Sequence, residues 1–242
     1  MQVESFLVNY YKSIPIVSRV LFSISIILTA LTYLDVITPY NLVYSFAHIK
    51  QFELWRAVTA FFYLGPATLD TLVHHFFMLK YCIMMEESGS SPADFLYMII
   101  VGMAMILVSA SFLGMSKLSS ALSTYIIYIW SKKNPLIIVQ YMGLFSIPAY
   151  YIPWIMFIFS SLAERALPVN DLVGIMAGHV YFYFKTVYTR TNPRSDPLRT
   201  PQVLKSLFIA GKPAEKREQQ RAEPAGEHRR AGRAATLDDI RE

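Results

Sequence analysis

The sequence predicts an all-α polytopic membrane protein with six membrane-spanning helices and an amphipathic helix at its N-terminus. Of its 242 residues, 54% are hydrophobic and 14% are aromatic, and the mean hydropathy is +0.37. The apolar residues form blocks that short polar connectors separate, which is typical of polytopic membrane proteins. The single cysteine, Cys82, excludes an internal disulfide framework.

Residues 1–15 are expected to form a helix that lies in the membrane interface and ends at Pro15. Apolar side chains recur there with i, i+3, i+4, i+7 spacing, and polar side chains occupy the other face. A soluble packing helix is the alternative. This segment lacks the long apolar stretch of a cleavable signal peptide. The apolar residues are Val3, Phe6, Leu7, Tyr10, Tyr11 and Ile14, and the polar ones are Glu4, Ser5, Asn9 and Lys12.

Residues 16–189 are expected to form the membrane domain, and an even number of spans puts both termini on one side. Lys12, the connector Lys132–Lys133 and the basic tail then share the cytosolic face, which agrees with the positive-inside rule. The predicted spans cover roughly 17–34, 69–85, 95–113, 118–130, 137–160 and 169–187.

Two of these spans are poor membrane helices by themselves. The fourth is only about 20 Å long at ~1.5 Å per residue, against ~30 Å of hydrocarbon. The second carries His74, His75 and Lys80, each costly against lipid. Neighbouring helices that surround a short polar span, or a locally thin bilayer, would make both tolerable. We therefore expect a compact bundle.

Two segments outside the spans differ in character. The connector 35–68 contains Trp55-Arg56, and these residue types suit an interfacial anchor, with the arginine reaching headgroups or carbonyl groups. Residues 190–242 hold 12 Lys/Arg and 8 Asp/Glu and are expected to form a largely disordered cytosolic tail, with one short amphipathic helix over 198–208. A solvated tail on the positive-inside face explains this charge better than a nucleic-acid site.

Eight short segments appear in an order that matches one family. The sequence resembles a derlin, a member of the rhomboid-like superfamily of six-helix membrane proteins, over about residues 15–208. The matching segments are ITPYNL (37–42), LWRAVTAFFYLGP (54–66), KYCIMMEE (80–87), PADF (92–95), YIWSKKNP (128–135), IPWIMFIFS (152–160), DLVGIMAGHVYF (171–182) and TPQVLKSLF (200–208).

The resemblance implies a multi-pass protein of the endoplasmic reticulum membrane that retrotranslocates misfolded luminal and membrane clients for ubiquitination and proteasomal degradation. It implies a membrane-embedded RING ubiquitin ligase complex and a cytosolic AAA unfoldase as partners, and no cofactor, metal or nucleic acid. The family hallmarks needed for this activity correspond to Trp55-Arg56 and to the small-xxx-small pair Gly174 and Gly178. The unfoldase-binding motif of some derlins, F-x-G-x-G-Q-R, is incomplete after Phe208, so recruitment is expected to be indirect.

The resemblance also implies a pseudoprotease. A rhomboid protease needs a serine activated by a histidine base, and the base position holds Asp171, with His179 two helical turns away. Ser119 occupies the nucleophile position without the flanking glycines. Where a protease has oxyanion-stabilising His and Asn, the second span has Asp70 and His74, and an acidic group would repel an oxyanion.

Retrotranslocation requires a lower barrier in the bilayer, because hydrocarbon leaves polar backbone unsatisfied. We expect a thinned bilayer and a polar half-channel, with Gly174 and Gly178 packing the sixth span on small residues of the fourth (Ser116, Ser120 and Ser123). The candidate cavity residues are Asp70, His74, His75, Ser119, Ser120, Asp171 and His179. For each, a structural hydrogen bond between helices is an equal alternative. A non-conducting adaptor that binds client helices is the other reading of the function; an active protease and a transporter with inverted repeats are less favoured.

Overall fold

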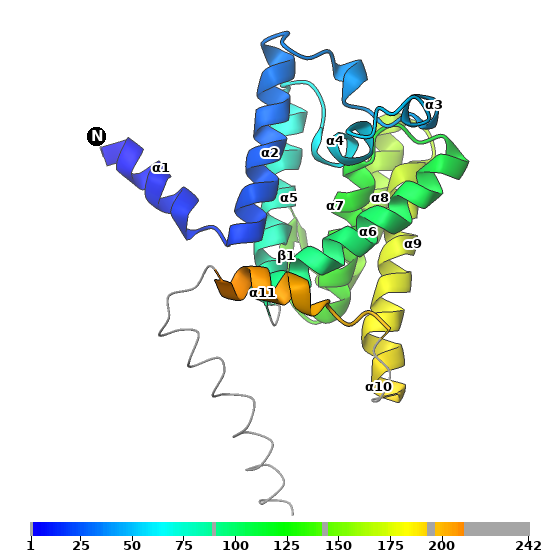
Figure 1. The fold of residues 1–242 in the computed structure, drawn as a ribbon. Helices are drawn as coiled ribbons and strands as arrows, with labels where there is room; N and C mark the ends of the chain where they lie inside the picture. The colour runs from blue at the N-terminus through cyan, green and yellow to red at the C-terminus, as the bar shows by residue number, and fades with distance from the viewer. Residues whose placement is uncertain (1, 89–90, 142–144, 193–196, 211–242) are drawn as a thin grey trace, which may run out of the picture. The chain divides into compact units, whose positions relative to one another are not determined.

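A computed structural model describes residues 2–88, 91–141, 145–192 and 197–210 (Figure 1). The chain divides into two compact units, residues 1–199 and 200–242. Within the described part, the chain is mostly helical. The tail beyond residue 210, which the sequence predicts to be largely disordered, lies outside the described residues.

The chain begins with two helices, α1 (Gln2–Ser13) and α2 (Ile16–Tyr33). Pro15, with φ −52° and ψ 148°, separates them as the sequence predicts. The turn is held by Arg19, whose Nη2 donates to the carbonyl oxygens of Lys12 (2.6 Å) and Ile14 (2.7 Å). The two helices are therefore joined by polar contacts at the turn, beyond the covalent link.

Three short helices occupy the connector before the second long helix: η1 (Pro39–Asn41), α3 (Phe46–Ile49) and α4 (Arg56–Phe62). The long helices α5 (Leu69–Glu87) and α6 (Pro92–Leu113) follow. Thr68 and Ser91 cap their N-termini by accepting a backbone N–H, and Gly114 ends α6 in the left-handed conformation.

The core of the first unit is α7 (Ser119–Lys133), which contacts α4, α5, α6, α8 and α9 (Figure 1). Almost every side chain from Ala121 to Ser131 is buried. The short fourth span is therefore surrounded by other helices, as expected. Because other helices enclose α7, its length does not have to match the thickness of the bilayer.

The predicted span 137–160 is wrong as a single helix. Residues Ile138–Tyr141 (β1) and Phe145–Pro148 (β2) form an antiparallel hairpin in which Ile138 pairs with Pro148. The one-turn helix η2 (Ala149–Tyr151) and then α8 (Ile152–Glu164) follow. The interior proline Pro148 cannot donate to a helix ladder, and the β-branched residues 137–139 favour extended backbone. The expected all-α class therefore needs correction by one hairpin.

The last long helix is continuous from α9 (Val169–Phe182) through a π-helical segment, η3 (Tyr183–Tyr188), to α10 (Thr189–Thr191). At ~1.5 Å per residue it is about 35 Å long. The second unit contains α11 (Gln202–Ala210), which overlaps the range 198–208 where the sequence predicts a short amphipathic helix and ends two residues beyond it.

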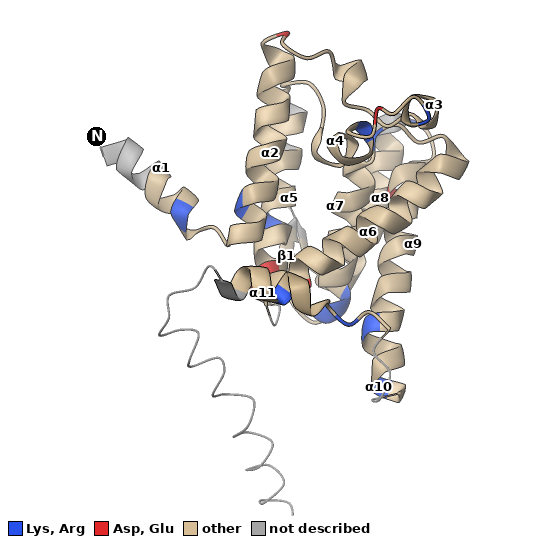
Figure 2. Cartoon of the chain, viewed as in Figure 1, with Lys and Arg blue, Asp and Glu red and all other residues tan. Residues whose placement is uncertain are grey.

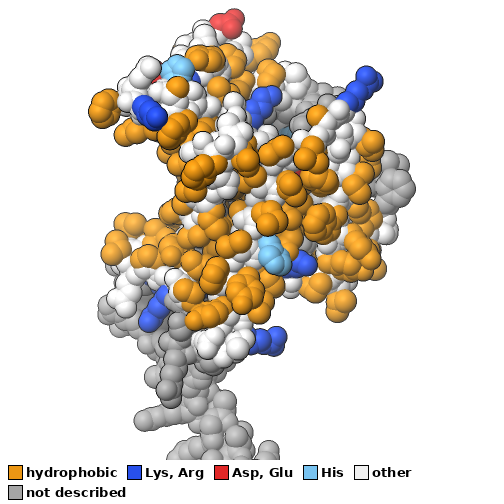
Figure 3. Space-filling view, turned by 90° about the vertical axis from the view of Figure 1, so that its right-hand side faces the viewer, with side chains coloured by type: hydrophobic (Ala, Val, Ile, Leu, Met, Phe, Trp, Pro, Cys, Tyr) orange, Lys and Arg blue, Asp and Glu red, His pale blue; other side chains and the backbone are white. Residues whose placement is uncertain are grey.

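The surface of the first unit is apolar. Among the described residues, α2 and α6 are the helices long and apolar enough to cross a membrane by length and composition. The outer side of α2 exposes Ile16, Val20, Ile24 and Ile27 at helical spacing. Charged residues lie mainly toward the helix ends (Figure 2), and hydrophobic side chains cover much of the face in Figure 3. This distribution is typical of a lipid-facing surface.

Candidate functional site

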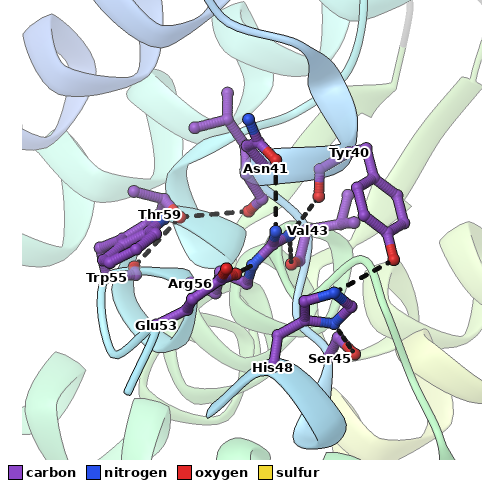
Figure 4. Close-up of polar contacts among 10 residues, drawn as sticks. Tyr40, Asn41, Val43, Ser45, His48, Glu53, Trp55, Arg56 and Thr59 are labelled. Carbon is purple, nitrogen blue, oxygen red and sulfur yellow. Dashed lines mark hydrogen bonds and ion pairs between the residues drawn. The ribbon is translucent and has the colours of Figure 1, made fainter. Parts of the chain in front are cut away.

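Arg56 is the centre of a polar cluster in the connector (Figure 4). Its guanidinium group donates to the Tyr40 carbonyl oxygen, the Glu53 carboxylate and Asn41 Oδ1 (3.2 Å), and lies 5.2 Å from the centre of the Tyr40 ring. Arg56 is only 2% exposed. The planar guanidinium can serve several acceptors at once, which an ammonium group could not do in this geometry. Of the two expected targets, headgroups or carbonyl groups, Arg56 contacts carbonyl groups of its own chain.

Trp55 lies beside this cluster but faces outward, with 54% of its surface exposed. Its exposed neighbours Phe52 (86%), Leu54 and Val58 extend the apolar surface; we call these four residues the interfacial patch. Arg56 starts α4 directly after Trp55, so the polar cluster fixes the backbone that carries the patch. The two residues of the pair therefore have different positions: the arginine is internal and the tryptophan is external.

Sequence reasoning assigned no role to the other members of this cluster. Tyr40 and Asn41 lie in the matching segment 37–42, but nothing in that segment indicates that they contact Arg56. His48 bonds on both sides of its ring, with Nδ1 3.0 Å from Ser45 Oγ and Nε2 3.4 Å from Tyr40 Oη (Figure 4). The cluster thus joins η1, α3 and α4 into one folded connector.

Gly174 and Gly178 lie where α9 packs tightly against α7. A Cβ atom at Gly174 would stand 2.4 Å from the Ala121 carbonyl oxygen, and one at Gly178 would stand 2.9 Å from Cδ1 of Tyr128. Gly174 thus permits close approach to the α7 backbone, and Gly178 leaves room for the Tyr128 side chain. The sixth and fourth spans do pack together, but the residues facing the glycines are Ala121, Thr124 and Tyr128, not Ser116, Ser120 and Ser123.

The contact between α7 and α9, which we call the α7–α9 seam, also buries the carboxylate of Asp171, which is 3% exposed. Its Oδ1 accepts hydrogen bonds from the hydroxyls of Ser120 and Thr124, the latter at 3.2 Å. Ser119 is also buried on α7, but these Asp171 bonds go to Ser120 and Thr124. One turn beyond Thr124 on α7, Tyr128 Oη lies 2.8 Å from His179 Nδ1. Each of these contacts joins α7 to α9, and a buried polar group needs such partners.

The remaining candidate cavity residues lie elsewhere. His75 is buried and lines a small cavity between α2 and α5, together with Ser25 and Cys82. Its Nδ1 donates to the Thr71 carbonyl oxygen (2.7 Å), and its Nε2 has no partner among the described residues. His74 is exposed, and the side chain of Asp70 lies outside the described residues. The described candidates therefore separate between the α7–α9 seam, the α2–α5 interface and the surface.

Metal binding has no support in the described part of the chain, where no group of three or more His, Cys, Asp or Glu side chains could hold an ion. The chemistry available in the seam is hydrogen bonding between helices. In the connector, the geometry supplies a rigid support for an exposed aromatic surface.

Comparison with known proteins gives a consistent result. The model of the Der1-like family matches residues 14–202. The chain is similar to Derlin-2.2 of Arabidopsis thaliana, at 38% identity over 83% of this chain and 87% of that protein. It is also similar to Derlin-2 of Oryza sativa subsp. japonica (36%; 83% and 85%) and to a probable derlin-2 homolog of Dictyostelium discoideum (30%; 83% and 82%). With the family model covering more than half of the chain, this protein belongs to the Der1-like family, the derlins.

Proposed function

We propose that this chain acts in endoplasmic-reticulum-associated degradation by thinning the bilayer and forming a polar half-channel, so that misfolded proteins retrotranslocate to the cytosol. Membership of the Der1-like family implies an ERAD-related function at the endoplasmic reticulum membrane and a rhomboid-like pseudoprotease. The proposed finer elements are a six-span topology with both termini cytosolic and a membrane-embedded RING ligase complex as partner. A cytosolic AAA unfoldase acts indirectly.

The observation that carries this proposal is the length of α8. Its 13 residues make about 20 Å of helix, or about 25 Å with η2, against ~30 Å of hydrocarbon. Unlike α7, α8 faces outward, exposing Trp154, Ile158 and Leu162 one turn apart. Thinning of the surrounding bilayer is one way in which a membrane accommodates a helix that is both short and lipid-facing, and it is the one proposed for α8. The thinning expected from the fourth span is therefore better assigned to α8.

The interfacial patch supports the same mechanism. An exposed tryptophan with apolar neighbours prefers the headgroup region, and the Arg56 cluster holds this patch on a fixed backbone. A rigid aromatic surface fixes the local position of the headgroups, whereas a flexible loop would move with them. The polar half-channel is a separate part of the proposal, and it would use the polar side chains of the α7–α9 contact. Because Asp171 already bonds to Ser120 and Thr124, client contact there would require exchange of those bonds.

Lengthening α8 tests the thinning mechanism. Inserting Leu-Ala-Leu-Leu after Leu162 adds about 6 Å of apolar helix and removes the mismatch. We expect a longer half-life for a misfolded luminal client in cells that express only this variant. The control inserts Ser-Gly-Ser-Gly between Leu167 and Pro168, which lengthens the chain equally without adding apolar helix. Wild-type client turnover by a normally inserted lengthened variant would contradict the mechanism.

Crosslinking separates conduction from the adaptor function. Photo-crosslinkers placed one at a time along α7, α8 and α9 would map a stalled client. A continuous line of contacts from the luminal to the cytosolic ends supports the half-channel. A single lateral patch supports a non-conducting adaptor and contradicts our proposal. Proteolysis is the less favoured function, because Asp171 occupies the position of the histidine base and its carboxylate bonds to Ser120 and Thr124.

A further inference from the structure

The first seven residues of α11, in the second unit, divide into an apolar and a polar side, and the apolar Ile209 that follows departs from this pattern. Over Gln202–Phe208, the apolar residues of α11 fall at i, i+1, i+4 and i+5, and the polar residues fall on the other side. The apolar positions are Val203, Leu204, Leu207 and Phe208; the polar ones are Gln202, Lys205 and Ser206.

The apolar side of this helix is partly exposed: Val203 and Leu207 are exposed, and Leu204 and Phe208 are half-buried. Val203 is 73% and Leu207 is 65% exposed, values normal for polar surface residues and costly for large aliphatic ones. An isolated helix of nine residues is also only marginally stable in water, because the free-energy cost of helix nucleation exceeds the stabilisation that two turns of hydrogen bonds provide. Both features point to a surface that stabilises α11 by covering its apolar side.

The charge around α11 indicates what covers it. Residues 190–217 contain seven Lys/Arg and two Asp/Glu, so the segment has a net charge of about +5. Basic residues that flank an apolar helical face are attracted to anionic lipid headgroups, at about 1 kcal/mol for each residue near the surface.

Two further features favour a bilayer over a protein. Residues 192–201 connect α11 to the end of α10 and reach at most about 35 Å, which sets the greatest distance between the two helices and leaves a bilayer within reach of α11. Four apolar side chains on two turns are far fewer than the roughly 20–30 residues a side of a specific protein interface. A bilayer needs no matching shape.

We propose that α11 is a membrane-surface helix of the tail. Val203, Leu204, Leu207 and Phe208 insert between the headgroups of an anionic leaflet, and Arg199 and Lys205 lie toward the lipid phosphates. This inference is independent of how clients cross the membrane. It adds a second lipid contact, outside the membrane domain, that keeps the start of the tail at the surface.

Fluorescence quenching in the full chain tests this placement. In a Cys82→Ser background, Leu207→Cys and Ser206→Cys variants are labelled with an environment-sensitive nitrobenzoxadiazole dye and reconstituted into vesicles of phosphatidylcholine and phosphatidylserine. We expect nitroxide-labelled lipid to quench the dye at 207 at least about twofold more than at 206, with the order reversed for aqueous iodide. Val203→Cys and Gln202→Cys form a second matched pair, so the result does not depend on one substitution.

Lipid composition and salt give the second readout. In vesicles of phosphatidylcholine alone, or at high salt, iodide access at 207 should rise toward that at 206, because screening removes the attraction. Equal quenching at both positions, under all conditions, would overturn the proposal by placing α11 in water. Protection at 207 from both quenchers would also overturn it, by showing that protein covers the apolar side.

Discussion

Glu86, near the end of α5, provides the sharpest test of how α2 is held. Its carboxylate accepts hydrogen bonds from the backbone N–H groups of Val17 (3.0 Å) and Ser18 (2.7 Å) and from the Ser18 hydroxyl (2.7 Å). Glu86 is 5% exposed. The first N–H groups of a helix have no partner within it, and Pro15 offers no side-chain cap to α2. A residue from another helix therefore supplies the missing acceptor.

The substitution Glu86→Gln keeps the shape and replaces one acceptor oxygen with a donor. Whichever way the amide turns, at least one N–H group of α2 then faces another N–H group. A buried donor left without a partner costs about 1–3 kcal/mol, and the lost charge at the helix N-terminus costs about another 1 kcal/mol. We expect the free energy needed to open this contact to fall by about 2–4 kcal/mol, which raises the equilibrium constant for opening roughly 30-fold to several hundred-fold.

Hydrogen–deuterium exchange resolved to single residues measures this change directly. Exchange at Val17 and Ser18 should accelerate by that factor, whereas the Arg19 amide, held by the Pro15 carbonyl oxygen at 2.9 Å, should change less. Glu87→Gln is the control, because Glu87 is the exposed neighbour of the same residue type. Unchanged exchange at Val17 and Ser18 in Glu86→Gln, equal to that of the control, would refute the capping role.

Three further predictions concern the connector, the glycine seam and the pseudoprotease. Arg56→Lys should speed proteolysis of the connector at least about tenfold, because one ammonium group cannot serve the same acceptors; equal resistance to protease would contradict this. Gly174→Ala should lower the melting temperature more than Gly178→Ala, since its Cβ meets a backbone carbonyl at 2.4 Å and the other meets the Tyr128 ring; the reverse order in a thermal-shift assay would show that the seam adjusts differently. Ser119→Ala should leave client half-life unchanged, and a cleavage product from a reconstituted transmembrane substrate that disappears in this variant would contradict the pseudoprotease assignment.

The order of the helices follows from local sequence. Caps at Thr68 and Ser91, the break at Pro15 and the left-handed Gly114 are signals that the chain carries within a few residues of each boundary. The apolar blocks between them predict the helices, and the family segments order them. The region 137–160 is the exception, because its apolar composition suits either a helix or a strand. Pro148 decides between them only in the context of the hairpin partner Ile138.

The partners of polar side chains depended on the tertiary structure. Sequence placed Asp171, His75 and Ser120 in one list of candidate cavity residues, since each is polar within an apolar block. Their contacts then separated them, with Asp171 and Ser120 in the α7–α9 seam and His75 between α2 and α5. Periodicity shows which residues share a face of one helix, but it does not show which helix lies opposite.

The sequence by itself predicted the family and most of the helices, with region 137–160 as the exception, and it drew attention to Trp55-Arg56 and the two glycines, because these predictions depend on residue type and local order. Only the tertiary structure decided that Arg56 is internal and Trp55 external, and that Ala121, Thr124 and Tyr128 face the glycines. It also revealed that Glu86 caps a helix 68 residues away. Hydrogen bonds are short and directional, so their pairing is set by how distant segments meet in space.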